Sequence, residues 1–206
     1  MVKIIGLSGG LSSPSRTKNL VTSIVNEIAG RASHQSVVID IADIAKDLGQ
    51  ALSTVNLAPS LQYAYQQLED ADILVIGVPV YKASYPGLFK HFFDLIDPKL
   101  LEGKVAVIAA TGGSDQHALV LEHQLRTLLN YLGIYSAPKT IFAKDTDFTN
   151  YQLNNPVIVE RIDAVADQAL WLARQHHAAP VDSISPHKAK EDDFEVPPLG
   201  LLSSYA

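Results

Sequence analysis

Residues 2–17 read VKIIGLSGGLSSPSRT, and this stretch decides the fold. Residues 2–7 form a short apolar run, residues 8–15 are mostly small or hydroxyl-bearing, and a helical pattern begins after Thr17. A strand–loop–helix of this kind presents backbone N–H groups at a helix N-terminus, where the helix dipole favours an anion. The serines add hydroxyl groups and Arg16 adds a fixed positive charge. The stretch therefore predicts a phosphate cradle at the head of an α/β fold.

The composition sets bounds on the class of protein. The chain has 206 residues, 47% of them hydrophobic, with a net charge of −6 and no cysteine. One domain is the default at this length, and the acidic balance argues against a nucleic-acid binder. Without cysteine there can be no disulfide, thiolate metal site or cysteine nucleophile. We see no signal peptide and no apolar run long enough to cross a membrane, so we expect a cytoplasmic protein.

Apolar runs alternate with helical patterns along the rest of the chain. The expected strands are residues 2–7, 36–41, 72–78, 104–110 and 134–143, the last interrupted by Pro138. The expected helices are residues 18–30, 60–70, 88–96, 115–132 and 155–175, with a short one at 43–48. This alternation predicts a parallel sheet with helices on both faces. We expect one domain over residues 1–177 and an extended or disordered tail over residues 178–206.

Three loops should meet at the carboxyl ends of the strands, where open parallel sheets bind ligands. They are residues 8–17, 79–86 and 111–117. The second contains two tyrosines that can pack on a flat ring. In the third, Gly112 and Gly113 let the backbone approach a ligand closely. Together the loops predict a site with a phosphate at one end and a planar ring at the other.

Other common sites are poorly supported. The chain has no Walker A motif, no complete G-x-G-x-x-G and no G-x-S-x-G elbow. His117 and His123 lie six residues apart, which is not a spacing that places two metal ligands on one helix face. We therefore expect no metal site, and we interpret Asp145 and Asp147 as solvated or capping groups.

Four segments of the chain resemble a known family. The loop SGGLSSPSRT at residues 8–17 resembles the phosphate loop of the NADPH-dependent FMN reductases. The segment PVYKASYPGLFK at residues 79–90 is similar to that family's P-x-Y-x-x-S-x-P-G-x-L-K, with Phe89 in place of the usual leucine, and Thr111-Gly112-Gly113 matches its second ring-side loop. Residues 112–126, GGSDQHALVLEHQLR, look most like the flavin reductases of two-component sulfonate monooxygenase systems.

The resemblance implies a flavodoxin-like three-layer α/β/α sandwich with a five-stranded parallel sheet in the order 2-1-3-4-5. It implies FMN and a nicotinamide nucleotide (NADPH or NADH), a homodimer or homotetramer, and transient delivery of reduced FMN to a partner monooxygenase. The FMN phosphate would contact Ser8, Ser13, Ser15, Arg16 and Thr17. The ribityl chain and ring would contact Pro79, Val80, Tyr81 and Ser84, and the ring edge would contact Thr111, Gly112, Gly113 and His117. No catalytic side chain is expected, because the flavin itself carries the hydride.

Some reductases of this kind carry a π-bulge in the fourth helix at a tetramer interface. By that resemblance we expect a π-turn near residues 121–124, with His123 pointing across a subunit interface towards the flavin site. Arg16 or Lys82 would favour NADPH over NADH if either meets the 2′-phosphate.

Two alternatives remain at this stage. The same loops suit a quinone or azo reductase that holds FMN tightly. They also suit a non-catalytic flavodoxin-like electron carrier or FMN-binding protein, although a net charge of −6 is mild for such a carrier.

Overall fold

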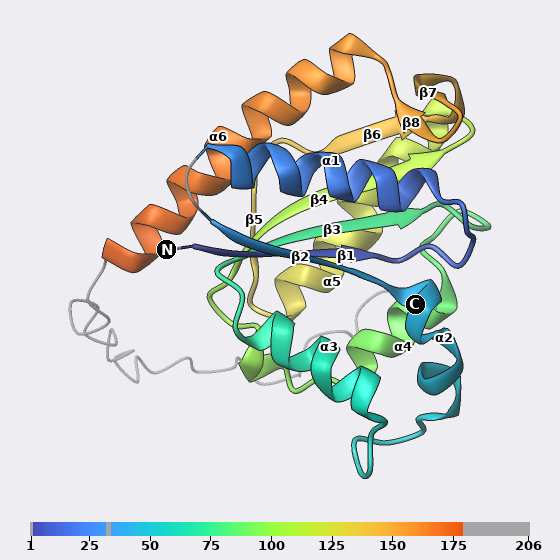
Figure 1. Ribbon diagram of the computed structural model, residues 1–206, viewed down its shortest axis with the longest axis vertical. Coiled ribbons are helices and arrows are strands. Elements are labelled where there is room, and N and C mark those ends of the chain that lie inside the picture. Colours follow the sequence, from blue (N-terminus) through green and yellow to red (C-terminus); the bar gives the residue numbers. More distant parts are fainter. Residues whose placement is uncertain (1, 32–33, 179–206) are drawn as a thin grey trace, which may run out of the picture.

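A computed structural model describes residues 2–31 and 34–178 and shows one sheet between two helical layers (Figure 1). The main strands are β1 (Lys3–Ser8), β2 (Gln35–Asp40), β3 (Ile73–Pro79), β4 (Val105–Gly112), β5 (Tyr135–Ser136) and β6 (Ile141–Lys144). The sheet is parallel in the order β2-β1-β3-β4-β5, and β6 also pairs with β4. The predicted flavodoxin-like architecture and strand order are confirmed.

The fifth strand differs from its prediction because it consists of two pieces. Tyr135 and Ser136 pair with the beginning of β4, and residues 141–144 pair with its end. Between them the chain leaves the sheet at Pro138, which has no N–H to donate to a strand ladder. The second piece carries the chain to the carboxyl edge of the sheet, next to the end of β4.

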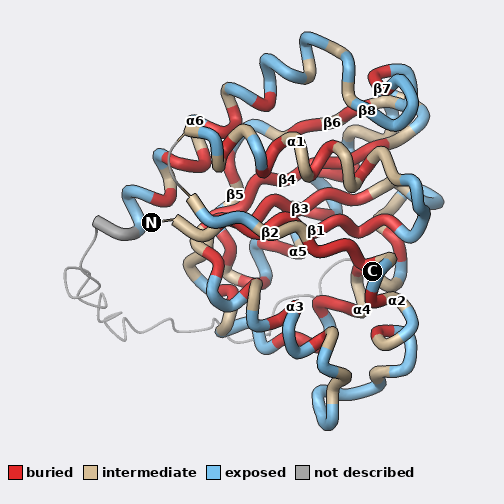
Figure 2. The backbone as a smooth tube through the Cα atoms, in the orientation of Figure 1, coloured by how far each residue is buried: buried red, intermediate tan, exposed pale blue. Residues whose placement is uncertain are grey.

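Each face of the sheet is covered by its own helices. The helices α1 (Arg16–Gly30) and α6 (Pro156–Ala178) cover one face, and α3 (Pro59–Glu69), α4 (Gly87–Asp94) and α5 (Arg126–Tyr131) cover the other. Alternate residues of one strand belong to the two cores: Ile4 faces α1 and α6, whereas Ile5 and Leu7 face α3 and α4. The central strands are therefore buried along their length (Figure 2), as their continuous apolar sequences predicted.

Helix α1 lies unusually close to the sheet at Gly77. A Cβ added to Gly77 would lie 2.4 Å from Cγ2 of Val21, a separation that side chains do not tolerate. The absence of a side chain at this position in β3 therefore sets the depth of α1, and with it the position of the helix N-terminus.

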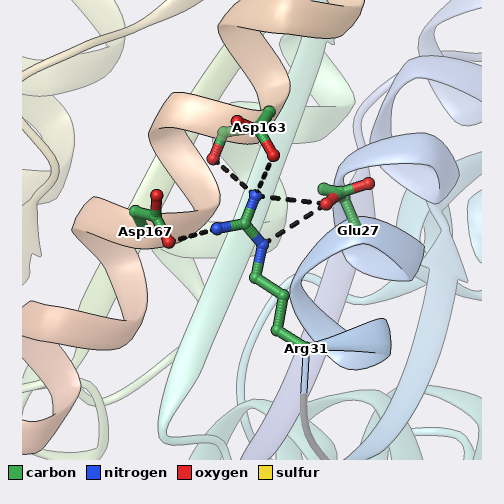
Figure 3. Close-up of polar contacts among 4 residues, drawn as sticks. All are labelled: Glu27, Arg31, Asp163 and Asp167. Carbon is green, nitrogen blue, oxygen red and sulfur yellow. Dashed lines mark hydrogen bonds and ion pairs between the residues drawn. The ribbon is translucent and has the colours of Figure 1, made fainter.

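A charge cluster fixes the far end of α1. Arg31 caps the helix and contacts Glu27 on the same helix and Asp163 and Asp167 on α6 (Figure 3). The bond from Arg31 Nη2 to Glu27 Oε1 is 3.1 Å long. One guanidinium thus joins the two helices that cover this face of the sheet.

Several predicted boundaries need correction. The helix expected at 43–48 is α2 (Ile41–Gln50), because Asp40 caps it and accepts a hydrogen bond from the Ala42 N–H. Helix α3 begins at Pro59, one residue before its expected start, and the Ser60 hydroxyl donates to Asp47. Helix α4 ends at Asp94, two residues before the expected end at residue 96.

The segment expected as one helix at 115–132 has three parts. Residues Asp115–Ala118 form a 3₁₀ turn, Leu121–Leu125 form a π-helix and α5 follows. A hairpin of β7 (Phe148–Thr149) and β8 (Gln152–Leu153) was not predicted. The predicted tail lies outside the described residues except for Ala178, the last residue of α6.

Candidate functional site

A cavity of about 220 Å³ lies where β1, β3, β4 and β6 end. Its lining is Ser12, Pro14, Ser15, Arg16, Thr17, Pro79, Val80, Tyr81, Thr111, Gly112, Gly113, Asp145 and Tyr151. Each of the three predicted loops contributes, and residues 145 and 151 close the wall after β6. The cavity lies beside β1 and β3, where the strand order of the sheet reverses.

The loop after β1 and the first turn of α1 form one end of the cavity. Ser15 caps the helix, and its Oγ accepts a hydrogen bond of 3.1 Å from the Lys18 N–H. Arg16 is the first helical residue, so its backbone N–H has no carbonyl partner one turn earlier. The Lys18 ammonium lies 3.1 Å from Asp40 Oδ2 and also pairs with Asp43. Burial lowers the Lys18 pKa, but these two carboxylates outweigh it and the pKa is raised. Arg16 is therefore the cation that lines the cavity.

Hydroxyl groups join this end to the neighbouring strand. Thr17 Oγ1 and Thr111 Oγ1 lie 2.7 Å apart and are both buried, which ties the start of α1 to the end of β4. The Val80 N–H donates to the Thr111 carbonyl over 2.8 Å, which ties the next loop to the same residue. Hydrogen bonds within the protein therefore hold the floor of the cavity.

The loop after β3 makes a tight turn at residues 81–84. Tyr81 and Ser84 exchange backbone hydrogen bonds of 2.7 and 3.1 Å. Lys82 and Ala83 between them have φ of 50° and 66°, the positive values that a type I′ turn requires and that side chains disfavour. The turn directs Tyr81 to the cavity, where its ring is partly exposed.

The loop after β4 is shaped by His117. A Cβ on Gly112 would lie 2.8 Å from the His117 Nδ1, so only glycine lets the imidazole pack against this backbone. Nδ1 is buried without a hydrogen-bond partner. His117 thus lies behind the loop that lines the cavity, and it does not line the cavity itself.

Three other residues predicted to contact FMN lie off the cavity wall. Ser8 is fully buried at the end of β1, and its Oγ has no partner. Ser13 lines a neighbouring hollow. The Ser84 hydroxyl donates to Gln124 Oε1 over 3.1 Å, towards the π-helix. The parts that we assigned them in FMN binding stay predictions.

Sequence reasoning missed Ser12, Pro14, Asp145 and Tyr151. Arg16 Nη1 lies 3.3 Å from Asp145 Oδ1, and the guanidinium carbon lies 5.2 Å from the centre of the Tyr151 ring. Asp145 follows β6 directly, and Tyr151 lies in the β7–β8 turn, where Asn150 and Tyr151 have φ of 49° and 66°. No residue pattern near 145–151 signalled this contact, because it depends on where β6 rejoins the sheet.

Polar side chains anchor the β7–β8 hairpin beside the cavity. Buried Asp147 accepts hydrogen bonds of 2.6 Å from the Lys144 N–H and from Asn155 Nδ2, so its interpretation as a capping group was sound. Asn19 of α1 donates to Gln152 Oε1 and accepts from the Leu153 N–H. These contacts hold Tyr151 over Arg16.

The expected π-turn is confirmed at Leu121–Leu125. His123 is exposed there and lines a groove of about 610 Å³ between α4 and α5. The hydrogen bond from Arg126 lowers the pKa of Glu122 in this turn. Other walls of the groove come from Phe93, Ile96 and Leu128. The groove is separate from the cavity at the strand ends.

In residues 2–31 and 34–178, no three His, Asp or Glu side chains lie together in a way that could hold a metal ion. No helix within those ranges has the length and apolar character needed to span a bilayer.

Comparisons with known proteins agree with this geometry. The profile of a family described as NADPH-dependent FMN reductase matches residues 2–149. The chain is 41% identical over 175 residues to an NADH-dependent FMN reductase, SfnF, of Pseudomonas fluorescens, covering 85% of this chain and 94% of that one. It is 40% identical over 167 residues to an FMN reductase (NADPH) of Pseudomonas aeruginosa, covering 81% and 90%.

Solved structures give the same picture. An oxidoreductase from Corynebacterium diphtheriae is similar with a TM-score of 0.75 and 34% identity, covering 85% of this chain and 98% of that one. The apo form of an NADH:FMN oxidoreductase, EMOB, also has a TM-score of 0.75, with 27% identity over 87% and 92% of the two chains.

Proposed function

Since the chain belongs to the NADPH-dependent FMN reductase family, we propose that it reduces FMN with NADH or NADPH. In this proposal the reduced FMN leaves for a partner flavin-dependent monooxygenase of sulfonate desulfonation. Support comes from relatives that are FMN reductases by name and from residues 112–126, which resemble the reductases of such systems. A cytoplasmic location belongs to the same proposal.

The residues present fit FMN at the cavity. A Cβ on Gly10 would lie 3.2 Å from Ser15 Oγ, so a side chain there would crowd the loop in front of the α1 N-terminus. Arg16, Ser12, Ser15 and Thr17 supply a cation and hydroxyl groups at that end. These groups match a phosphate monoester, which accepts charge-assisted hydrogen bonds.

The other end of the cavity fits the ring system. Gly112 and Gly113 present bare backbone, and Pro79 and Tyr81 present flat or rigid apolar surface. The flavin, when bound, supplies the hydride chemistry without a protein acid or base. With FMN bound, Arg16 and the hydroxyl groups would hold the phosphate, and the backbone at 111–113 would orient the ring.

One observation carries the proposal. The same cavity at the strand ends is lined by the Arg16 guanidinium at one end and by the backbone of Gly112 and Gly113 at the other. The test is steady-state oxidation of NADH and of NADPH, each with FMN, FAD and riboflavin. We expect rapid oxidation with FMN and a KM at least tenfold higher for riboflavin, because riboflavin lacks the 5′-phosphate that Arg16 would bind. Absence of FMN-dependent oxidation would overturn the enzyme assignment. A purified protein that keeps bound yellow flavin would instead favour the quinone or azo reductase.

We also propose that the chain works as a homodimer or homotetramer through the groove between α4 and α5. The groove carries Phe93, Ile96 and Leu128, and Tyr131 beside them is 80% exposed. His123 stands at this groove and would reach a neighbouring subunit. Its proposed role is to face the flavin site across that interface, and deletion of His123 should then change FMN affinity.

A further inference from the structure

The guanidinium of Arg16 is engaged from two sides by residues that sequence reasoning did not connect with it. Asp145 Oδ1 lies 3.3 Å from Arg16 Nη1, and the Tyr151 ring lies over the guanidinium at 5.2 Å. All three residues line the same cavity. The Asp145 carboxylate therefore pairs with one nitrogen of the guanidinium that would bind the FMN phosphate.

We propose that Asp145 is a built-in competitor of the flavin phosphate, which keeps FMN affinity low enough for the flavin to be released after reduction. This inference rests on the proposed function and deepens it. It assigns Asp145 no chemical step, only control over how tightly the phosphate is held.

The ion pair is weak enough to be displaced. The Arg16 and Asp145 side chains are 40% and 57% exposed, and pairs in such surroundings contribute little to stability. A phosphate monoester with up to two negative charges is a stronger partner for a guanidinium than one carboxylate. Arrival of the phosphate would thus break the Arg16–Asp145 contact.

Asp145 would still lie at the cavity wall after that exchange. It follows β6 directly in a 3₁₀ turn whose third residue, Asp147, is buried and hydrogen-bonded at both oxygens. These bonds fix the backbone at 145, so the carboxylate would stay close to a phosphate bound at Arg16. Like charges at that separation repel, and the repulsion weakens binding.

A merely orienting role for Asp145 is less well supported. Tyr151 already covers the guanidinium, and the hairpin that bears it is held by Asn19 and Asp147. Arg16 therefore keeps a neighbour that orients it when Asp145 is neutralised. The two roles predict opposite changes in FMN affinity when Asp145 is replaced. Removal of a competitor tightens FMN binding, and removal of an orienting residue weakens it.

The experiment measures dissociation constants for FMN and riboflavin by quenching of flavin fluorescence, in the wild type, Asp145→Asn and Asp145→Ala. We expect both variants to bind FMN about tenfold more tightly, the order of effect for one charge removed near a phosphate at a half-exposed site. Riboflavin affinity should change less than twofold, because riboflavin has no phosphate.

Asp70→Asn is the matched control. It removes the same charge from another exposed ion pair, with Lys3 at 3.0 Å at the opposite end of the sheet, and should leave FMN affinity unchanged. Unchanged or weaker FMN binding in both Asp145 variants, while the wild type still prefers FMN to riboflavin, would overturn the competitor role and leave the proposed function standing. Equal affinity of the wild type for FMN and riboflavin would overturn the phosphate cradle itself, and the competitor role with it.

Discussion

Two tight turns flank the cavity, and they are built in different ways. The turn at residues 81–84 and the turn at residues 149–152 both carry two non-glycine residues with positive φ. The first follows β3 directly and is tied to β4 by the backbone bond from Val80 to Thr111. The second belongs to a separate hairpin that is anchored by the side chains of Asn19, Asp147 and Asn155.

The difference shows that one site can combine a turn positioned by the sheet with a turn positioned by side chains. The first turn extends a core strand, so the sheet itself positions it and Tyr81 precedes the strained residues. The second turn places Tyr151 in the strained conformation, and side-chain hydrogen bonds must compensate for that cost of roughly 1–2 kcal/mol. We expect the two turns to respond differently to substitution.

The largest expected effect is on flavin affinity, and it should distinguish the phosphate end of the cavity from the ring end. Arg16→Ala should weaken FMN binding by about 10- to 100-fold and leave riboflavin binding nearly unchanged, because a charged hydrogen bond is worth roughly 1.5–3 kcal/mol. Tyr81→Ala, on the first turn, should weaken both flavins by similar factors. Fluorescence titration with both flavins gives the ratios, and equal losses in the two variants would contradict the division of the cavity.

The next effect is on stability, and it concerns the hydrogen bonds that hold the turns at residues 81–84 and 149–152. Asp147→Ala leaves two partly buried donors without an acceptor and should lower the free energy of unfolding by about 2–3 kcal/mol. Ser84→Ala removes one exposed hydrogen bond to Gln124 and should cost no more than about 0.5 kcal/mol. Urea titrations of both variants test the contrast. Similar losses would mean that the first turn also depends on its side chains.

The smallest effect probes backbone strain within the turns. Ala83→Gly relieves a left-handed conformation and should raise the free energy of unfolding by about 0.5 kcal/mol, after the entropy cost of glycine. Asn150→Gly should gain less, since asparagine tolerates this region better than alanine does. Thermal unfolding of the two variants gives the comparison, and a larger gain at 150 would reverse our assignment of where strain is stored.

The predictable parts of the molecule were those set by local chemistry. The runs at β1, β3 and β4 and the Gly-, Pro- and Ser-rich loops after them predicted the parallel sheet and most of the cavity wall, and the family resemblance supplied the strand order. Pro138 signalled a break in the last strand, but the return of the chain as β6 depends on pairing with residues 109–112, far away in sequence.

Asp145 and Tyr151 could not be predicted for the same reason. Their neighbour Arg16 lies more than 120 residues earlier in the chain, and only the register of β6 against β4 brings the hairpin to it. Ser8 was predicted to contact the phosphate, but its side chain is buried. Side chains alternate along β1, and this alternation directs the Ser8 hydroxyl into the core.

The cluster around Arg31 has a consequence for the approach of substrates. It lies at one end of α1, where three carboxylates surround one guanidinium, and Arg16 lies at the other end of this helix of 15 residues, a separation of about 22 Å. The Arg31 cluster has one cation and three carboxylates, so it repels anionic nucleotides more strongly than the Arg16–Asp145 pair does at the other end of the helix. Such polarity biases the orientation of diffusional encounters and acts on the association rate, with no bond to the ligand required.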